Sequence, residues 1–204
     1  MIISPHTQQS IEWHNERIGL ITGSMFKEII TTKGMPTVDS RRTKYMEELA
    51  GEIITGRPTK RYVSAPMKAG TEKEDEARLL YEMIKGVDVQ TVGLCYKDEQ
   101  KLFGASPDGL VGLSGGFETK NAEPATQIMR FRTNWNGMEH FQQVQGGIFI
   151  CEREWWDLQS YCESMRPIII RFYRNEPFIK KLDQALNQFH EELMLLVRKL
   201  KGIK

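Results

Sequence analysis

The sequence predicts an α/β fold in which a small mixed β-sheet is flanked by helices and followed by a long C-terminal helix. Three observations lead to this prediction. Short strand patterns fill the middle of the chain, between residues 90 and 121, and helical patterns lie on both sides of them. From Glu176 to Leu200, large apolar residues recur at alternating four- and three-residue steps, which is the spacing of one helix face.

Two helices are expected at the start of the chain, between Ser10 and Ile30. A break at Gly19 separates them, and the second begins near Thr22 or Ser24. The other helices are predicted from apolar periodicity and, for the first two, from a glycine at the end of the pattern. They cover residues 40–55, 72–85, 125–132, 139–151 and 176–200. Two segments are expected to be irregular: 31–39 and 57–69.

The strands are predicted from alternation of apolar and polar residues and from the turn residues between them. They are expected at residues 90–96, 102–105, 109–113, 117–121, 155–161 and 167–173. Ser114, Gly115 and Gly116 form a typical turn sequence, so a hairpin is expected to join the strands on either side of it.

The composition is that of an ordinary globular protein, with 204 residues, 40% hydrophobic and 27% charged. This size fits one domain covering residues 1–204. No apolar run reaches the ~18 residues of a membrane span, and the first residues do not form a secretory signal. Three cysteines without CxxC spacing argue against a disulfide framework or a zinc site, so a cytoplasmic location and no membrane partner are expected.

The net charge of +1 argues against a protein that coats nucleic acid indiscriminately. It does not exclude a nuclease, which can gather cations on one face and carboxylates in its active site. The chain contains no Gly-x-x-x-x-Gly-Lys loop and no Gly-x-Ser-x-Gly elbow. P-loop NTPases and typical serine hydrolases are therefore disfavoured.

The predicted hairpin carries the most informative chemistry. Alternation places Glu118 and Lys120 on one face of a strand, and Asp108 is expected on the same face of the partner strand, diagonally across from Lys120. Paired carboxylates suit Mg²⁺ or Mn²⁺, and a nearby lysine can position or activate a water for attack on phosphorus. The alternative is a cross-strand salt bridge on an exposed face. A second Glu-x-Lys triplet, ending at Lys101, is interpreted as a solvated turn.

Glu74 is a further candidate. It lies at the edge of an apolar helix stripe formed by Ala77, Leu80, Tyr81 and Ile84. A carboxylate near the core needs a cation, and Arg78, one turn later, can supply it through an i,i+4 ion pair. Helix geometry alone favours this ion pair. The alternative is a metal held jointly with Asp108 and Glu118.

Four other residues are weaker candidates. Gln143 lies on an apolar helix, where an amide is often structural but can also orient a phosphate or the Lys120 ammonium. Arg17 and Ser24 flank a glycine turn that can hold a phosphate with helix N-terminal amides, the alternative being simple capping by Ser24. Trp13 is more typical of a core residue than of a base-stacking platform.

These motifs, in this order, resemble the phage lambda exonuclease family, the alkaline exonuclease or YqaJ-like viral recombinase branch of the PD-(D/E)xK nucleases. The resemblance begins at Trp13-His14 and Arg17 to Ser24, and continues through Gly70 to Arg78. It then includes Ser106 to Leu110, Phe117 to Lys120, and Gln143-Val144-Gln145. The family often has Cys-Pro after its lysine, whereas this chain has Asn121-Ala122, and residues 31–69 align poorly.

The resemblance implies a restriction-endonuclease-like core and a Mg²⁺-dependent exonuclease that degrades one strand of duplex DNA from the 5′ end. It implies that Glu74, Asp108, Glu118, Lys120 and Gln143 are catalytic, that the Thr119 carbonyl joins the carboxylates as a metal ligand, and that two Mg²⁺ ions bind, with Mn²⁺ as a substitute.

By the same resemblance, Trp13, Arg17 and Ser24 would hold a 5′-phosphorylated DNA end. The family also implies a ring-shaped homotrimer, a phage single-strand annealing protein as partner, and a bacterial host cytoplasm. Two alternatives stay open: an endonuclease or junction resolvase with the same core, or a non-catalytic DNA-binding or assembly module.

Overall fold

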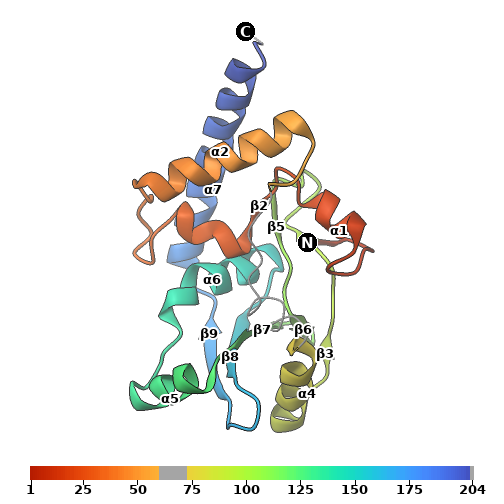
Figure 1. Cartoon of the computed structure of the whole chain (residues 1–204), viewed down its shortest axis with the longest axis vertical. Helices are drawn as coiled ribbons and strands as arrows, with labels where there is room; N and C mark the ends of the chain where they lie inside the picture. The colour runs from red at the N-terminus through yellow and green to blue at the C-terminus, as the bar shows by residue number, and fades with distance from the viewer. Residues whose placement is uncertain (60–72, 203–204) are drawn as a thin grey trace.

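The computed structural model describes residues 1–59 and 73–202. Most of the segment expected to be irregular, 57–69, and the expected helix start at residue 72 lie outside the described residues. Two small sheets form the centre of the fold, with strand orders β1-β4-β5-β2 and β3-β6-β7-β8-β9. Helices surround both sheets (Figure 1). The predicted α/β class with a mixed sheet and a long C-terminal helix is confirmed.

The four-stranded sheet joins the N-terminal part of the chain to its middle. Its strands are β1 (Ile2–Ile3), β4 (Cys95–Tyr96), β5 (Phe103–Ala105) and β2 (Ile21–Thr22). Only the pairing of β2 with β5 is parallel.

The five-stranded sheet carries the hairpin. Its strands are β3 (Val89–Gln90), β6 (Gly109–Val111), β7 (Gly115–Asn121), β8 (Trp155–Tyr161) and β9 (Ile168–Tyr173). The pairing of β7 with β8 is parallel and the others are antiparallel. The prediction of one strand over 90–96 is wrong, because the chain divides there into β3 and β4 of different sheets. Gly93 permits this passage, since a Cβ there would lie 2.0 Å from the His6 carbonyl oxygen.

The hairpin register also differs from the expectation. Ser114, Gly115 and Gly116 were expected to form the turn, but β7 begins at Gly115 and the turn lies at residues 112–114. The physical reason is the tryptophan pair that begins β8. A Cβ at Gly115 would lie 2.2 Å from the Trp155 ring, and one at Gly116 would lie 2.1 Å from the Trp156 ring. These glycines therefore serve close packing inside the sheet.

The helices agree with the predictions except near two boundaries. They are α1 (Ile11–Glu16), η1 (Gly23–Glu28), α2 (Ser40–Thr55), α4 (Glu74–Lys85), α5 (Pro124–Arg132), η2 (Met138–His140), α6 (Phe141–Ile150) and α7 (Glu176–Leu200). The second N-terminal helix is a six-residue 3₁₀ helix, η1, preceded by strand β2. The helix expected over 139–151 begins with the short 3₁₀ segment η2.

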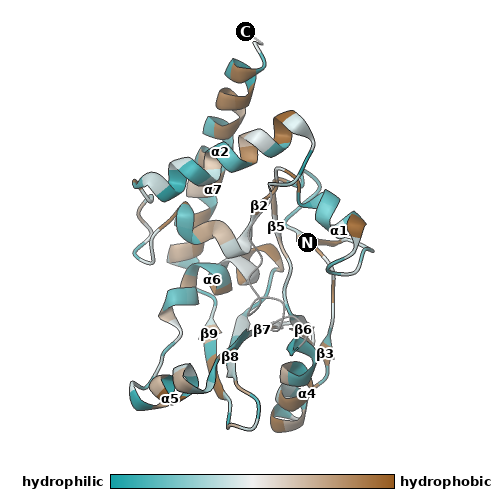
Figure 2. Ribbon diagram, in the orientation of Figure 1, coloured by the Kyte–Doolittle hydropathy of each residue, from teal (hydrophilic) through white to brown (hydrophobic). Residues whose placement is uncertain are grey.

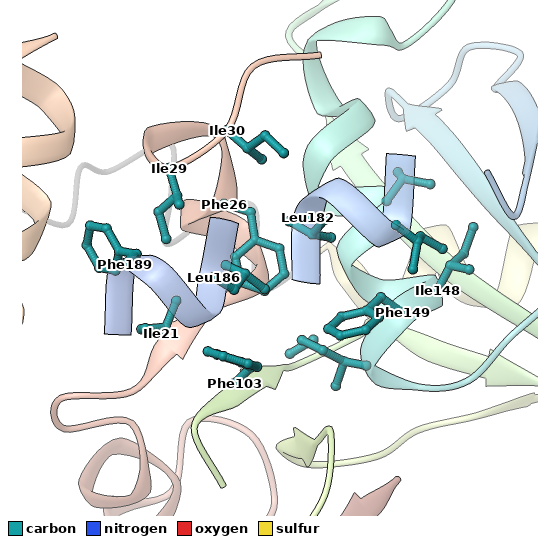
Figure 3. Packing of buried hydrophobic residues seen from close by; sticks show 14 of the residues in the cluster. Ile21, Phe26, Ile29, Ile30, Phe103, Ile148, Phe149, Leu182, Leu186 and Phe189 are labelled. Carbon is teal, nitrogen blue, oxygen red and sulfur yellow. The ribbon is translucent and has the colours of Figure 1, made fainter. Parts of the chain in front are cut away.

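The long helix α7 organises the main core. Leu182, Leu186 and Phe189 lie buried between residues of η1 and α6, including Phe26 and Ile148 (Figure 3). Hydrophobic and hydrophilic residues alternate along α7 as an amphipathic helix requires (Figure 2).

The C-terminal end of α7 is more exposed than its middle. Buried residues of the predicted α7 stripe continue through Leu193, whereas Leu200 is 62% exposed where the helix extends past α2 (Figure 1). In the described part of the chain, no helix is both long and apolar enough to cross a membrane.

Candidate active site

The hairpin brings Asp108 beside Glu118. Asp108 immediately precedes β6, and Gly109 pairs with Phe117, so one further step along the ladder places the two acids opposite each other. The backbone N–H of Thr119 donates to Asp108 Oδ2 at 2.7 Å. A turn at residues 114–116 would have paired Phe117 with Leu113, whereas Phe117 pairs with Gly109, four residues earlier. Because four is an even number, each side chain stays on the face that was expected for it.

Glu118 and Lys120 project from the same face of β7, as predicted. Lys120 Nζ lies 2.7 Å from Glu118 Oε1, and Gln143 Nε2 donates to the same oxygen at 2.5 Å. The Glu118 side chain is only 8% exposed. The alternative of a cross-strand salt bridge on an exposed face is therefore wrong, because the ion pair lies within one strand and is largely buried.

Helix α6 places Gln143 over this face of the sheet. Two glycines of α6 allow the close approach: a Cβ at Gly146 would lie 2.5 Å from the Phe26 ring, and one at Gly147 would lie 2.8 Å from the Trp156 ring. Gln145 of the same helix is structural, since its side chain donates to the Tyr173 carbonyl at 2.8 Å.

Helix α4 lies on the opposite face of the sheet and begins at Glu74. Its predicted core residues Ala77 and Tyr81 are buried, whereas Ile84 is exposed. The Tyr81 ring packs 4.4 Å from the Phe117 ring, and its hydroxyl donates to buried Asp157 at 2.7 Å. This contact ties α4 to the sheet and thereby sets the position of its first turn.

Glu74 is not paired with Arg78, contrary to the ion pair that helix geometry favours. Arg78 lies 3.2 Å from Asp75 and 3.3 Å from Glu82 instead. Burial, and then repulsion from Glu118, raises the pKa of Glu74 to about 7. Glu74 therefore belongs electrostatically to the hairpin cluster rather than to its own helix.

The cluster has an excess of negative charge on carboxylates that are buried or partly buried. Burial, and then the charge of Glu118, raises the pKa of Asp108 well above its usual range. Burial opposes the charged form of Lys120, but the Glu118 and Asp108 carboxylates outweigh it and raise the pKa of that ammonium. Three carboxylates thus face one cation, an imbalance that a divalent metal ion would relieve.

The donor set fits a hard divalent cation. Its side-chain oxygens come from Glu74, Asp108 and Glu118, whose carboxylates act on one another electrostatically. Among the described residues, no three Asp, Glu, His or Cys side chains are already gathered at metal-binding distance. In this arrangement Glu118 bonds Lys120 and Gln143, and Asp108 bonds the Thr119 amide.

A cavity of about 170 Å³ adjoins the cluster and brings together the N-terminal candidates. Trp13, Arg17 and Ser24 line it together with Glu118 and Gln143. It therefore contains residues that lie more than a hundred positions apart in the sequence.

Arg17 and Trp13 are held at this cavity by Ser106, which lies between β5 and β6. The Arg17 guanidinium lies 4.4 Å from the centre of the Trp13 ring. Both side chains donate to Ser106 Oγ, at 3.1 and 3.0 Å. The sequence reasoning missed this role of Ser106, although the residue belongs to the Ser106-Pro107-Asp108 motif. Trp13 is also a buried core residue, as its residue type suggested.

Ser24 does not cap a helix. The residue before η1 is Thr22, which makes no side-chain capping bond, so the capping interpretation of Ser24 is wrong. A second, larger cavity of about 540 Å³ lies on the other side of the carboxylates. Glu74, Asp108 and Arg78 line it together with residues 3–8. The carboxylate cluster is thus reached from two sides.

Comparisons with known proteins find solved structures with the same fold. The alkaline exonuclease LHK-Exo from Laribacter hongkongensis is 30% identical to this chain, with 95% of this chain and 97% of that one covered, and the structures superpose with a TM-score of 0.84. A second structure of LHK-Exo, in complex with dAMP, has the same identity and coverage and a TM-score of 0.85.

A phage-related exonuclease from Haemophilus somnus 129PT shares the fold at 12% identity, with a TM-score of 0.69 over 89% of this chain and 96% of that one. No match is found among the curated proteins. The YqaJ-like viral recombinase domain matches residues 12–154, a range that contains every candidate site residue described above. The chain belongs to the YqaJ-like viral recombinase family and is a homologue of the alkaline exonucleases.

Proposed function

We propose that this protein is a Mg²⁺-dependent 5′-to-3′ exonuclease that degrades one strand of duplex DNA and leaves 3′ single-stranded overhangs. Membership of the alkaline exonuclease family supports a DNA exonuclease. One observation supports the 5′-to-3′ direction: Arg17 and Ser24 line the same cavity as Glu118 and Gln143. A cation-lined pocket for a terminal phosphate thus adjoins the acids that would act on the next phosphodiester.

Asp108 and Glu118, with Glu74 and the Thr119 carbonyl, would hold two Mg²⁺ ions, and Mn²⁺ is expected to substitute. When bound, such ions polarise a phosphoryl oxygen and lower the pKa of water. The buried carboxylates supply the negative charge that holds the ions. The low exposure of the Glu118 side chain also strengthens the electrostatic interactions of the site.

Lys120 would position the attacking water and hold or move its proton. Its ammonium is fixed by Glu118 Oε1, and Gln143 fixes the same carboxylate from α6. Gln143 therefore orients Glu118, and through it Lys120, without contributing a charge.

Arg17 would bind the 5′-terminal phosphate with Ser24, while Trp13 holds the guanidinium in place. The ring and Ser106 restrict Arg17 to the cavity, so little rotamer freedom is lost when a phosphate binds. We further propose one nuclease domain over residues 1–204, a homotrimeric ring around DNA, cooperation with a phage single-strand annealing protein, and action in the bacterial cytoplasm.

Digestion of a linear duplex with Mg²⁺ tests the proposal. One strand carries a 5′ label and, in a parallel reaction, a 3′ label. Early release of the 5′ label as a mononucleotide, while the 3′ label stays in long fragments, is the expected result. Release of the 3′ label first would reverse the polarity. Cleavage of a covalently closed plasmid would favour an endonuclease or resolvase, and absence of Mg²⁺ binding in calorimetry would favour a non-catalytic module.

A further inference from the structure

Arg130 of α5 reaches the strand position next to Lys120. In the parallel pairing of β7 with β8, Lys120 is the neighbour of Ser160. Neighbouring residues of paired strands project from the same face of a sheet. Arg130 Nη1 donates to Ser160 Oγ at 2.7 Å. The guanidinium therefore lies on the face that carries Glu118 and Lys120.

The guanidinium of Arg130 is held in place, and in the described part of the chain it forms no ion pair, although the charge of Glu139 acts on it from a greater distance. It lies 4.5 Å from the centre of the Trp135 ring, and the Trp135 indole is itself bonded to Glu139. Within residues 1–59 and 73–202, no carboxylate lies at ion-pair distance from Arg130, and its single hydrogen bond goes to a neutral hydroxyl. A partly buried cation that is fixed in this way is prepared for an anion from outside the chain.

His140 completes the same neighbourhood. Its ring packs edge-on against Trp135 at 6.3 Å, and its Nε2 is buried without a hydrogen-bond partner. Burial, and then the charge of Lys120, lowers the pKa of His140 to about 4, with Arg130 and Lys27 acting in the same direction and Glu139 opposing them. The imidazole is therefore neutral at pH 7, and cations from three elements surround it.

Along the sheet, the Arg17 cavity, the carboxylate cluster and Arg130 follow one another in this order. Trp156 lines that cavity and pairs with Gly116, whereas Ser160 pairs with Lys120. The two positions are four residues apart on β8, or about 13 Å at roughly 3.3 Å per residue. Glu118 lies between them. A strand with its 5′ phosphate at Arg17 and its scissile group at Glu118 would continue toward Arg130.

We propose that Arg130 binds a phosphodiester group of the degraded strand on the 3′ side of the scissile phosphate, and that the His140 ring, packed against Trp135, borders the same subsite. This inference deepens the proposed function and rests on it. A guanidinium presents a planar set of donors that matches two phosphate oxygens, which an ammonium does not. The subsite would hold the continuing strand in line with the Lys120 ammonium.

Salt-dependent DNA binding tests the contact. Affinity for a 5′-phosphorylated duplex is measured by fluorescence anisotropy in EDTA at several salt concentrations, for the wild type, Arg130→Gln and Arg132→Gln. Loss of one phosphate contact lowers the slope of log K against log salt by about one. Arg132 is the matched control, since it is exposed, lies on the same helix and projects about 200° away. Equal slope changes in both variants would overturn the proposal.

A modified substrate separates a direct contact from a structural effect. A neutral methylphosphonate replaces the phosphodiester that follows the scissile one. It should weaken wild-type binding by about as much as Arg130→Gln does, and it should weaken the variant little further. Additive losses would exclude the contact. If Arg130→Gln does not fold, Arg130→Lys takes its place and should lose only part of the effect.

Cleavage and binding measured together distinguish failure of the Arg130 subsite from failure of the proposed exonuclease function. A wild-type protein that cleaves linear duplex but shows no methylphosphonate effect refutes the subsite and leaves the proposed function standing. A wild-type protein that does not cleave DNA refutes the proposed function itself.

Discussion

Lys120 Nζ lies 2.7 Å from Glu118 Oε1, two residues earlier on the same strand, and Gln143 donates to that same oxygen. One carboxylate oxygen thus joins the cation of β7 to the amide of α6. This geometry holds Lys120 at the edge of the carboxylate cluster, where a positioned ammonium can act on a water that attacks phosphorus.

Lys120→Ala should fold and bind DNA but lose cleavage by about 10²–10⁴-fold, the usual contribution of a general acid or base. Single-turnover digestion and fluorescence anisotropy measure the two properties. The matched control is Lys101→Ala, because Lys101 ends the other Glu-x-Lys triplet and lies on an exposed turn. Near-normal cleavage by Lys120→Ala would remove the lysine from the mechanism.

Asp108→Asn should abolish cleavage and yet stabilise the metal-free protein. The amide keeps an oxygen for the Thr119 N–H but carries no charge, so it avoids both burial of an anion and repulsion from Glu118. Each kcal/mol gained would raise the melting temperature by about 2–4 °C for a chain of this size. Thermal unfolding in EDTA measures it, and a lower melting temperature than wild type would contradict the charge argument.

Glu74 should make the metal-free protein less stable as the pH rises from 4.5 toward 7. Burial and Glu118 raise the pKa of Glu74 from its usual 4.5 to about 7, so the folded protein keeps a proton that the unfolded chain has lost. Stability is therefore lost across this window. Melting temperatures in EDTA at pH 5 to 8 should fall more steeply for the wild type than for Glu74→Gln. Parallel curves would mean that Glu74 titrates normally.

Arg17→Ala should impair degradation of 5′-phosphorylated ends more than that of 5′-hydroxyl ends. The loss on the phosphorylated end is expected to be about 10-fold or more, which corresponds to one charge-assisted contact. Initial rates on the two substrates give the comparison. An equal loss on both would reassign Arg17 to general DNA contact.

The local parts of this site were predictable from the sequence. Side chains two residues apart on a strand share a face in any register, so Glu118 and Lys120 were placed together correctly. Helix α2, which ends before Gly56, was also predicted at its observed bounds. Each of these features depends on residues that lie close together in the sequence.

The convergence of distant residues was not predictable from spacing. Arg17 lines the same cavity as Glu118 because η1 packs against α6, and that packing depends on the absence of a side chain at Gly146, which lies against the Phe26 ring. Likewise, three acids lie three or four residues from Arg78 on its helix, and only tertiary packing decides that Asp75 and Glu82 bind it while Glu74 faces the cluster. The family resemblance supplied these roles where periodicity alone did not.

Gly116 gives a test of how the register of the catalytic strand is held. A Cβ at this position would lie 2.1 Å from the Trp156 ring, which is fully buried between the sheet and α6. Gly116→Ala must therefore displace Trp156 or β7, and overpacking of this kind costs about 1–3 kcal/mol, occasionally more. Since Glu118 is two residues away, metal affinity should fall together with stability.

Urea unfolding and Mg²⁺ calorimetry measure the two effects. The control is Gly51→Ala, because Gly51 lies inside α2 with nothing within 4 Å of an added Cβ. That variant should be more stable than the wild type by up to about 1 kcal/mol, since alanine favours a helix over glycine. If Gly116→Ala were as stable as Gly51→Ala and bound Mg²⁺ normally, the tryptophan contact would not be what sets the register of β7.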